Sequence, residues 1–183
     1  MHLLFVLNLD ALSPNHLNPM NPAIDKPLLV RELIQRMQAD LQQARQAAEQ
    51  AHAGATHEQS KAETQYDTLG LEHAYLAEGQ SRRIESLVQG MLRLEHMGLP
   101  TLSDDDAIVL GAVIDVRQLS ASPHPDQTLF LASAGGGYQI PFGESLITVI
   151  TPQSPLGEEL LGRYLFDEFK WPNGTDGEIT GLV

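Results

Sequence analysis

Apolar residues recur at alternating spacings of four and three through the first third of this 183-residue chain, and no other feature constrains its fold as strongly. The positions are Val30, Ile34, Met37, Leu41, Ala44, Ala48 and Ala51. This spacing is typical of the heptad seam of a coiled coil, and Pro27 is favoured as the first residue of a helix. Because the seam thins to alanine, a partner helix can approach its second half closely. The pattern predicts one helix of a paired-helix rod.

A second helical stretch supplies the partner for the first. Its apolar side carries Leu69, Leu76, Ile84, Leu87, Met91 and Leu94. Between the stretches lies the polar segment 54–61, where Gly54, Thr56 and Ser60 are typical of a chain reversal. A helix of roughly 28 residues is about 40 Å long, which exceeds what a globular core of this size needs. We therefore expect an antiparallel coiled-coil hairpin over residues 26–98, with its tip near 54–66.

Downstream of Gly98 and Pro100 the apolar period changes from helical to two. The segments rich in β-branched and aliphatic residues are 107–116, 128–134, 146–151 and the closing 176–183. Ser154 is placed to cap a short helix that begins at Pro155 and stops at Gly162. The predicted fold class is α+β, with a helical hairpin followed by a small antiparallel sheet domain over 99–183 that carries one short helix.

Composition limits the function classes. Eleven basic and twenty-four acidic residues give a net charge of −13, which disfavours binding to duplex DNA. The absence of cysteine excludes disulfides and thiolate chemistry and fits a reducing, cytoplasmic setting. The apolar run 3–9 is too short to span a membrane and lacks the features of a signal peptide.

Residues 1–25 are rich in proline, and we expect them to form a loosely ordered extension. Met20 offers an alternative start, so it is open whether residues 1–19 belong to the native protein. The alternative for the run 3–9 is an added strand or a docked segment.

Two motifs that suggest ligand binding are weak. The triplet Gly135-Gly136-Gly137 lacks the lysine and the strand-to-helix context of a phosphate-binding loop, so we interpret it as a turn. His52 and His57 are five residues apart, a spacing that does not place them on one helix face as a zinc pair. We expect no cofactor and no stably bound metal.

The C-terminal half carries a distinctive series of motifs. Val149 to Arg163 include a strand, a Ser-Pro helix start and a Gly-Arg ending, and Asp167-Glu168-Phe169 and Gly177-Glu178-Ile179 follow. This series resembles the C-terminal domain of bacterial Gre-type transcript cleavage factors. The order of parts is also similar, because that family places a coiled coil before an FKBP-like domain. In the second helix Tyr66, Gly79, Arg83, Ile84 and Leu87 lie close to the family's spacing. The resemblance covers roughly residues 27–183.

This resemblance implies an elongation factor or regulator that acts on RNA polymerase and is not itself an enzyme. The globular domain would dock at the rim of the secondary channel, and the coiled coil would pass to the active centre. The docking region would include Ser154, Pro155, Leu156 and Gly162. We expect a cytoplasmic monomer whose partner is RNA polymerase, that meets transcript RNA only within that complex, and that binds neither free duplex DNA nor a membrane.

The tip departs from the family pattern. In the family, two acidic residues precede the tyrosine and help to hold the polymerase's second Mg²⁺, but Gln59 and Ala62 stand at those positions here. The nearby carboxylates are Glu58, Glu63 and Asp67. A displacement of one residue turns a side chain by about 100° on a helix. We therefore expect polymerase binding more firmly than stimulation of cleavage, and the sequence leaves open whether cleavage is stimulated or inhibited.

Several alternatives stay open. Arg82 and Arg83 would contact RNA or the channel wall, or they would pair with Glu78 or Glu85 on a solvated helix face. The alternatives for the whole chain are an FKBP-like isomerase or chaperone with a helical arm, and a coiled-coil adaptor for another partner. An isomerase would need an aromatic-lined pocket, whereas aromatic residues make up 5% of the chain.

Overall fold

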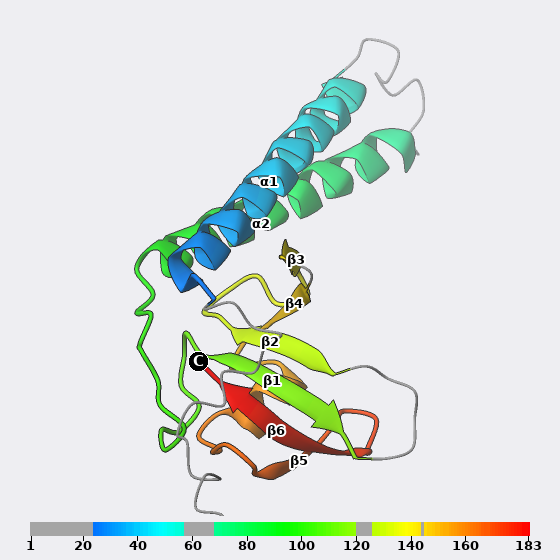
Figure 1. Cartoon of the computed structure of the whole chain (residues 1–183). Helices are drawn as coiled ribbons and strands as arrows, with labels where there is room; N and C mark the ends of the chain where they lie inside the picture. The colour runs from blue at the N-terminus through cyan, green and yellow to red at the C-terminus, as the bar shows by residue number, and fades with distance from the viewer. Residues whose placement is uncertain (1–23, 57–67, 120–125, 144) are drawn as a thin grey trace, which may run out of the picture.

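The computed structural model describes residues 24–56, 68–119, 126–143 and 145–183 (Figure 1). The elements, in chain order, are α1 (Lys26–Thr56), α2 (Thr68–Glu95), β1 (Val113–Gln118), β2 (Gln127–Leu131), β3 (Gln139–Phe142), β4 (Ser145–Ile150), α3 (Pro155–Leu160), β5 (Glu168–Lys170) and β6 (Asp176–Leu182). The two long helices lie side by side and project away from the sheet (Figure 1). The predicted fold class, a helical hairpin followed by a sheet domain with one short helix, is confirmed.

The sheet has six strands in the order β3-β4-β2-β1-β6-β5. The sheet was predicted to be antiparallel. Its strands are mostly antiparallel, but β2 and β4 pair in parallel. The sequence pattern also missed β3 and β5, which are the two edge strands. Edge strands are often short and tolerate proline, and β3 has four residues including Pro141 while β5 has three. Neither is long enough to show a clear period of two.

The predicted strand over 107–116 was too long at its N-terminal end, because β1 begins at Val113. The residues before it form irregular structure that crosses to the segment after α3. There the amide of Ile108 donates to the carbonyl of Arg163 at 2.7 Å, and the amide of Gly162 donates back to Ile108 at 2.8 Å. Ile108 is fully buried, so its apolar character reflects core packing rather than a strand.

Alternate residues of the central strands face opposite sides of the sheet, and each side carries its own core cluster. Val113, Phe130 and Val149 lie on the side covered by the base of the helical hairpin. Ile114, Leu131 and Ile150 lie on the side covered by α3 and the segment before β1. The base of the hairpin is therefore part of the folded core.

Two leucines that the heptad pattern did not include attach α1 to the sheet. Leu29 and Leu33 are fully buried in the cluster beneath the hairpin. Gly135 adopts a left-handed φ of +80°, and a Cβ there would lie 2.9 Å from a methyl carbon of Leu33. Glycine at this position therefore lets the turn approach the helix closely. The glycine triplet is a turn, as predicted, and its contact is with the protein's own helix.

The heptad seam of α1 is largely confirmed where its side chains are described. Val30, Met37, Leu41 and Ala44 are buried, and Ile34 and Ala48 are half-buried. On α2, Leu94 is buried and Ile84, Leu87 and Met91 are half-buried. The prediction for Leu76 was wrong, because its side chain is 58% exposed. The two helices diverge toward their far ends (Figure 1), where Leu76 is exposed.

Candidate partner-binding surfaces

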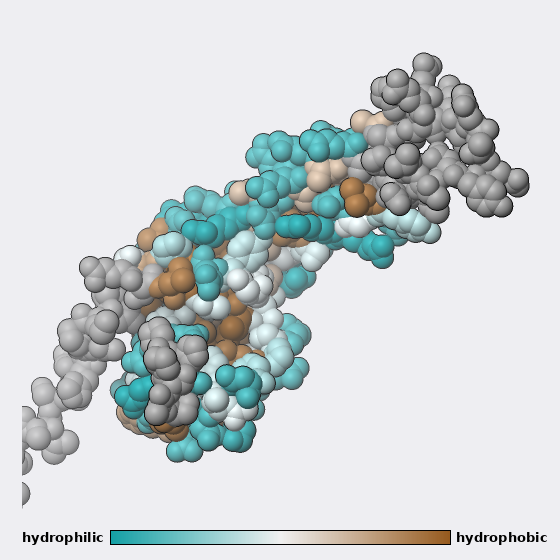
Figure 2. Space-filling view, turned by 90° about the vertical axis from the view of Figure 1, so that its right-hand side faces the viewer, coloured by the Kyte–Doolittle hydropathy of each residue, from teal (hydrophilic) through white to brown (hydrophobic). Residues whose placement is uncertain are grey.

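The outer half of the helical hairpin contributes little to the core. The last buried residue described on α1 is Ala44, yet the helix continues to Thr56, roughly 18 Å further at about 1.5 Å per residue. On α2, the buried residues among those described are Gly90 and Leu94, both near its C-terminal end. Figure 2 shows hydrophobic surface gathered where the hairpin meets the globular part and mainly hydrophilic surface along the projecting helices. The outer half of the hairpin therefore projects from the globular part as an arm, while its base packs on the sheet (Figure 1).

The predicted tip carboxylates, Glu58, Glu63 and Asp67, lie outside the described residues, as do Gln59, Ala62 and Tyr66. The described helices end at Thr56 and resume at Thr68, so the tip segment connects their outer ends. Delivery of these carboxylates to a partner therefore stays a prediction. Of the predicted loose extension 1–25, residues 1–23 lie outside the described part of the chain. The prediction was wrong for its last two residues, because Ile24 is buried in the cluster beneath the hairpin and the carboxylate of Asp25 accepts a hydrogen bond of 3.0 Å from the amide of Leu28.

Arg82 forms a local ion pair on α2. Its guanidinium nitrogen lies 3.4 Å from a carboxylate oxygen of Glu78, one helical turn earlier, and both side chains are mostly exposed. The ion pair is the one that the solvated-face alternative named, and contact of Arg82 with RNA or the channel wall stays a prediction. Exposed pairs of this kind contribute about 0.3–0.5 kcal/mol to helix stability.

Arg83 forms an ion pair across the hairpin instead of with Glu78 or Glu85 of its own helix, and its contact with RNA or the channel wall stays a prediction. Its guanidinium lies 3.6 Å from the carboxylate of Asp40 on α1. The same carboxylate accepts a hydrogen bond of 2.7 Å from the hydroxyl of Tyr138, which directly precedes β3. Burial raises the pKa of Tyr138 to about 12, and the bond to Asp40 acts in the same direction. Asp40 thus links both helices of the arm to the globular domain, a role that helical spacing could not reveal.

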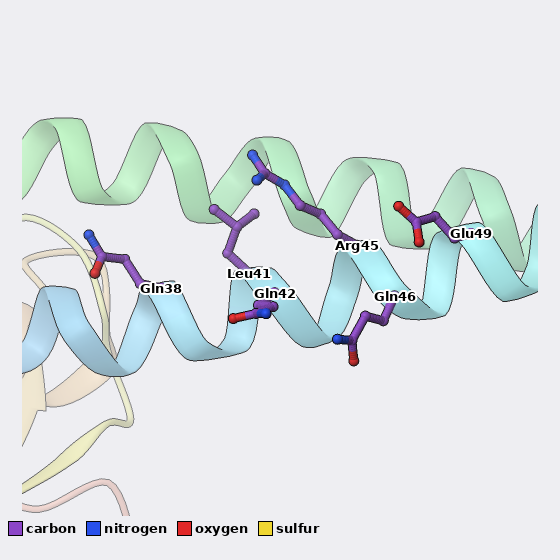
Figure 3. A pocket seen from close by; sticks show the side chains of 6 residues that line it. All are labelled: Gln38, Leu41, Gln42, Arg45, Gln46 and Glu49. Atoms are coloured by element: carbon purple, nitrogen blue, oxygen red, sulfur yellow. The ribbon is translucent and has the colours of Figure 1, made fainter.

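A groove of about 510 Å³ runs along α1 beside α2 (Figure 3). It is lined by Gln38, Leu41, Gln42, Arg45, Gln46 and Glu49. Leu41 and Arg45 point toward α2, whereas Gln46 points away from it (Figure 3). The lining comes from one helix and is mainly amide-bearing, so it forms a polar stripe on the arm. It has no aromatic wall of the kind that a prolyl isomerase would need.

A second cavity, of about 380 Å³, lies where the arm joins the domain and is lined in part by Ile24, Lys26, Leu99 and Val183. Lys26 is 7% exposed, and its ammonium donates to the carbonyl of Pro100 at 2.6 Å. Burial lowers the pKa of Lys26. This bond ties the start of α1 to the segment that follows α2, so the lysine anchors both ends of the hairpin.

Most residues of the predicted docking region cap, pack or end the short helix α3. The hydroxyl of Ser154 accepts a hydrogen bond of 3.1 Å from the amide of Gly157 and donates to the carbonyl of Thr151 at 2.7 Å. Leu156 packs against the adjacent core cluster. Gly162 has a left-handed φ of +82° and ends the helix, as predicted. Of the predicted docking residues, Pro155 and Gly162 are exposed.

The exposed apolar residues of this region come directly after the helix, and the sequence reasoning missed them. They are Leu161, Tyr164 and Phe166, with exposed fractions of 46%, 51% and 70%. Leu165 between them packs against the core. The sequence does contain a sign of this exposed surface, namely the apolar run Tyr164-Leu165-Phe166 after the end of the helix. In this run the central residue packs on the core and its two neighbours are exposed to solvent.

The globular half carries most of the negative charge. Residues 99–183 contain three basic and twelve acidic residues, a net charge of −9. Each of the three cations has a carboxylate partner: Arg117 with Glu178, Arg163 with Glu159, and Lys170 with Asp176. These contacts raise the pKa of Arg117 and of Lys170. The remaining carboxylates give this half an acidic surface suited to a basic partner.

In the described ranges, no group of three or more histidine, aspartate or glutamate side chains is placed to hold a metal ion. No helix within those same ranges has the length and apolar character needed to cross a bilayer.

The described residues define a class of protein, a helical-hairpin arm on a small, acidic β-sheet base. No protein-family model and no curated protein matches the chain. Among solved structures it is similar to GreA factor homolog 1 (Gfh1) of Thermus thermophilus, at 17% identity over 82% of this chain and 94% of that chain, with a TM-score of 0.32. It is also similar to Thermus aquaticus Gfh1, at 21% identity, 81% and 92% coverage and a TM-score of 0.31. A further structure of the transcription factor Gfh1 gives 20% identity, 82% and 93% coverage and a TM-score of 0.33. Likenesses at this level assign neither a family nor an activity.

Proposed function

We propose that this chain binds RNA polymerase as an elongation factor or regulator, with the globular base docked at the rim of the secondary channel and the arm reaching inward. The observation that carries the proposal is the arm: among the α1 residues whose burial is described, Ala44 is the last buried one, although the helix runs to Thr56. Because the outer half of the arm adds little to the hydrophobic core of the protein, we infer that it serves to contact a partner. The Gre-type residues of the C-terminal half support polymerase as that partner.

The charge distribution also supports a protein partner. The described helices of the arm carry seven basic and seven acidic residues, so they are neutral overall, while the base is strongly acidic. A neutral arm with a glutamine-lined face can enter a channel that already holds nucleic acid without strong repulsion from phosphates. An acidic base would instead seat on a basic protein surface. Within the proposal, the chain itself performs no catalysis.

The tip carries the proposed chemistry. Glu58, Glu63 and Asp67 are the carboxylates proposed to approach the polymerase's own Mg²⁺, for which oxygen ligands are suited. Because Gln59 and Ala62 occupy the positions where acidic residues are expected, we propose binding and regulation first, with transcript cleavage as the finer alternative.

The first test is binding of the full chain to bacterial core RNA polymerase, followed by transcript cleavage in backtracked complexes. Binding with cleavage supports a cleavage factor, and binding without cleavage supports a regulator or competitor. No binding would overturn the polymerase proposal and leave an adaptor for a different partner. Alanine variants of Glu58 and Glu63 should melt like the parent, and Glu49→Ala, an exposed carboxylate on α1, is the matched control.

The position of the arm can be tested separately by crosslinking. A photo-reactive residue at position 76, which is 58% exposed on the outer part of α2, should crosslink to polymerase subunits that line the channel. The same group at Glu95, exposed at the base of α2, should give a different pattern or none. Identical products from both positions would contradict insertion of the arm.

A further inference from the structure

Phe166 is held in a backbone conformation that phenylalanine rarely adopts. Its φ is +68°, and it is the one non-glycine residue with positive φ in the part of the chain that the structure describes. Bulky side chains are disfavoured in this region, whereas glycine enters it freely. The ring is 70% exposed, so its packing does little to offset the strain. A strained aromatic that points to solvent suggests a use outside the fold.

Hydrogen bonds to β6 fix the backbone around Phe166. Its amide donates to the carbonyl of Ile179 at 2.9 Å, and the amide of Ile179 donates to the carbonyl of Asp167 at 3.1 Å. The carboxylate of Asp167 accepts from the amide of Tyr164 at 2.9 Å. The loop is therefore held in one conformation on an ordered strand, and its exposed side chains need little further ordering to bind a partner.

Arg163 braces the other side of the same loop. Its guanidinium donates to the carbonyl of Glu159 at 2.6 Å and to the carbonyl of Glu168 at 2.9 Å, and it also pairs with the Glu159 carboxylate. This single side chain connects the end of α3 to the start of β5. Its carboxylate partner is Glu159, so the exposed Glu158 and Glu168 keep their negative charge at the surface.

Carboxylates surround the exposed apolar residues along the chain. Glu158 on α3 and Glu168 on β5 are exposed, within a domain of net charge −9. The complementary surface is an apolar groove bordered by lysine or arginine. A second copy of this chain would bring like charges together, which disfavours self-association at this face.

We propose that Leu161, Tyr164 and Phe166 form the docking face of the globular base, with Phe166 inserted into an apolar groove that basic side chains border on the polymerase surface. This inference rests on the proposed function and names the residues that carry it. It places the main docking contact on the loop after α3, where the apolar side chains are exposed, rather than on the helix start at Ser154. Aromatic anchors of this kind often dominate the affinity of an interface.

The decisive experiment measures the affinity of the full chain for bacterial core RNA polymerase, together with its melting temperature. Phe166→Gly should weaken binding at least tenfold without lowering the melting temperature, because glycine fits the left-handed backbone. Phe166→Asn, which also tolerates positive φ, should give the same result. Leu146→Ser, at an apolar residue 51% exposed on β4 toward the opposite end of the sheet, should bind like the parent. Raising the salt concentration should weaken the parent's binding.

The outcomes separate the two proposals. If the parent binds and both Phe166 variants bind equally well, the docking face is wrong while the polymerase proposal stands. If the parent does not bind, both fall together. Sedimentation that finds a parent dimer and a Phe166→Gly monomer would assign this face to self-association and overturn the inference.

Discussion

The hydroxyl of Tyr138 donates a hydrogen bond to the carboxylate of Asp40 at 2.7 Å, joining residues 98 positions apart in the chain. Asp40 lies on α1 and Tyr138 lies at the edge of the sheet beside β3, while Arg83 on α2 approaches the same carboxylate at 3.6 Å. The three side chains hold the arm at one angle to its base. An arm that must enter a partner benefits from a fixed direction, because less freedom is then lost on binding.

Replacing Tyr138 by phenylalanine should destabilise the protein by about 1–2 kcal/mol, because it removes a hydrogen bond to a charged group. Urea unfolding at neutral pH measures the change. Tyr164→Phe, at a tyrosine that is 51% exposed, is the control and should shift stability by less than about 0.5 kcal/mol. Equal stability of parent and Tyr138→Phe would show that this contact does not secure the arm.

The same tyrosine predicts a dependence on alkaline pH. The folded pKa of Tyr138 is raised from 10.0 to about 12, first by burial and then by the bond to Asp40. A raised pKa means that the stabilising contribution is fully present below the unfolded value and is lost as pH rises through the folded value. The stability difference between parent and Tyr138→Phe should therefore shrink between about pH 10 and pH 12. Unfolding series at pH 8, 10 and 11 would reveal it, and a difference that grows with pH would contradict the assignment.

The anchoring of the arm should depend on its base and not on its outer half. Leu33→Ala, at a fully buried residue of α1, should cost about 2–5 kcal/mol through lost burial and the cavity left behind. Leu76→Ala, at a residue 58% exposed on α2, should change stability by less than about 0.5 kcal/mol. Thermal unfolding compares them. A large loss for Leu76→Ala would mean that the outer arm packs more tightly than this structure describes.

Two glycines on α2 should respond differently to alanine. Gly79 has nothing within 4 Å of an added Cβ, so Gly79→Ala should stabilise the protein by about 0.5–1 kcal/mol through helix propensity. At Gly90 an added Cβ would lie 2.8 Å from the Met37 methyl carbon and 3.3 Å from the Ala134 Cβ. Gly90→Ala should therefore gain less than Gly79→Ala, or lose stability. Parallel melting curves test the order, and a larger gain at Gly90 would refute it.

The fold class was predictable because each half carries a local, periodic signal. The four-three spacing from Val30 to Ala44 predicted the seam, and Ser154 with Gly162 predicted both ends of α3. The strands with a clear period of two were also found. The edge strands β3 and β5 were missed because they are too short to show a period of two. The parallel pairing of β2 with β4 was missed because the alternation along one strand does not indicate which strand lies beside it.

The sequence by itself determined the helical hairpin, the core strands of the sheet and the concentration of negative charge in the C-terminal half, since these follow from the order and spacing of residue types. Only the tertiary structure decided that Arg83 pairs with Asp40, that Leu29 and Leu33 bury against the sheet, and that Phe166 is strained and exposed. These features arise when segments far apart in the chain meet. Spacing along one helix or strand contains no information about which distant side chain will lie opposite.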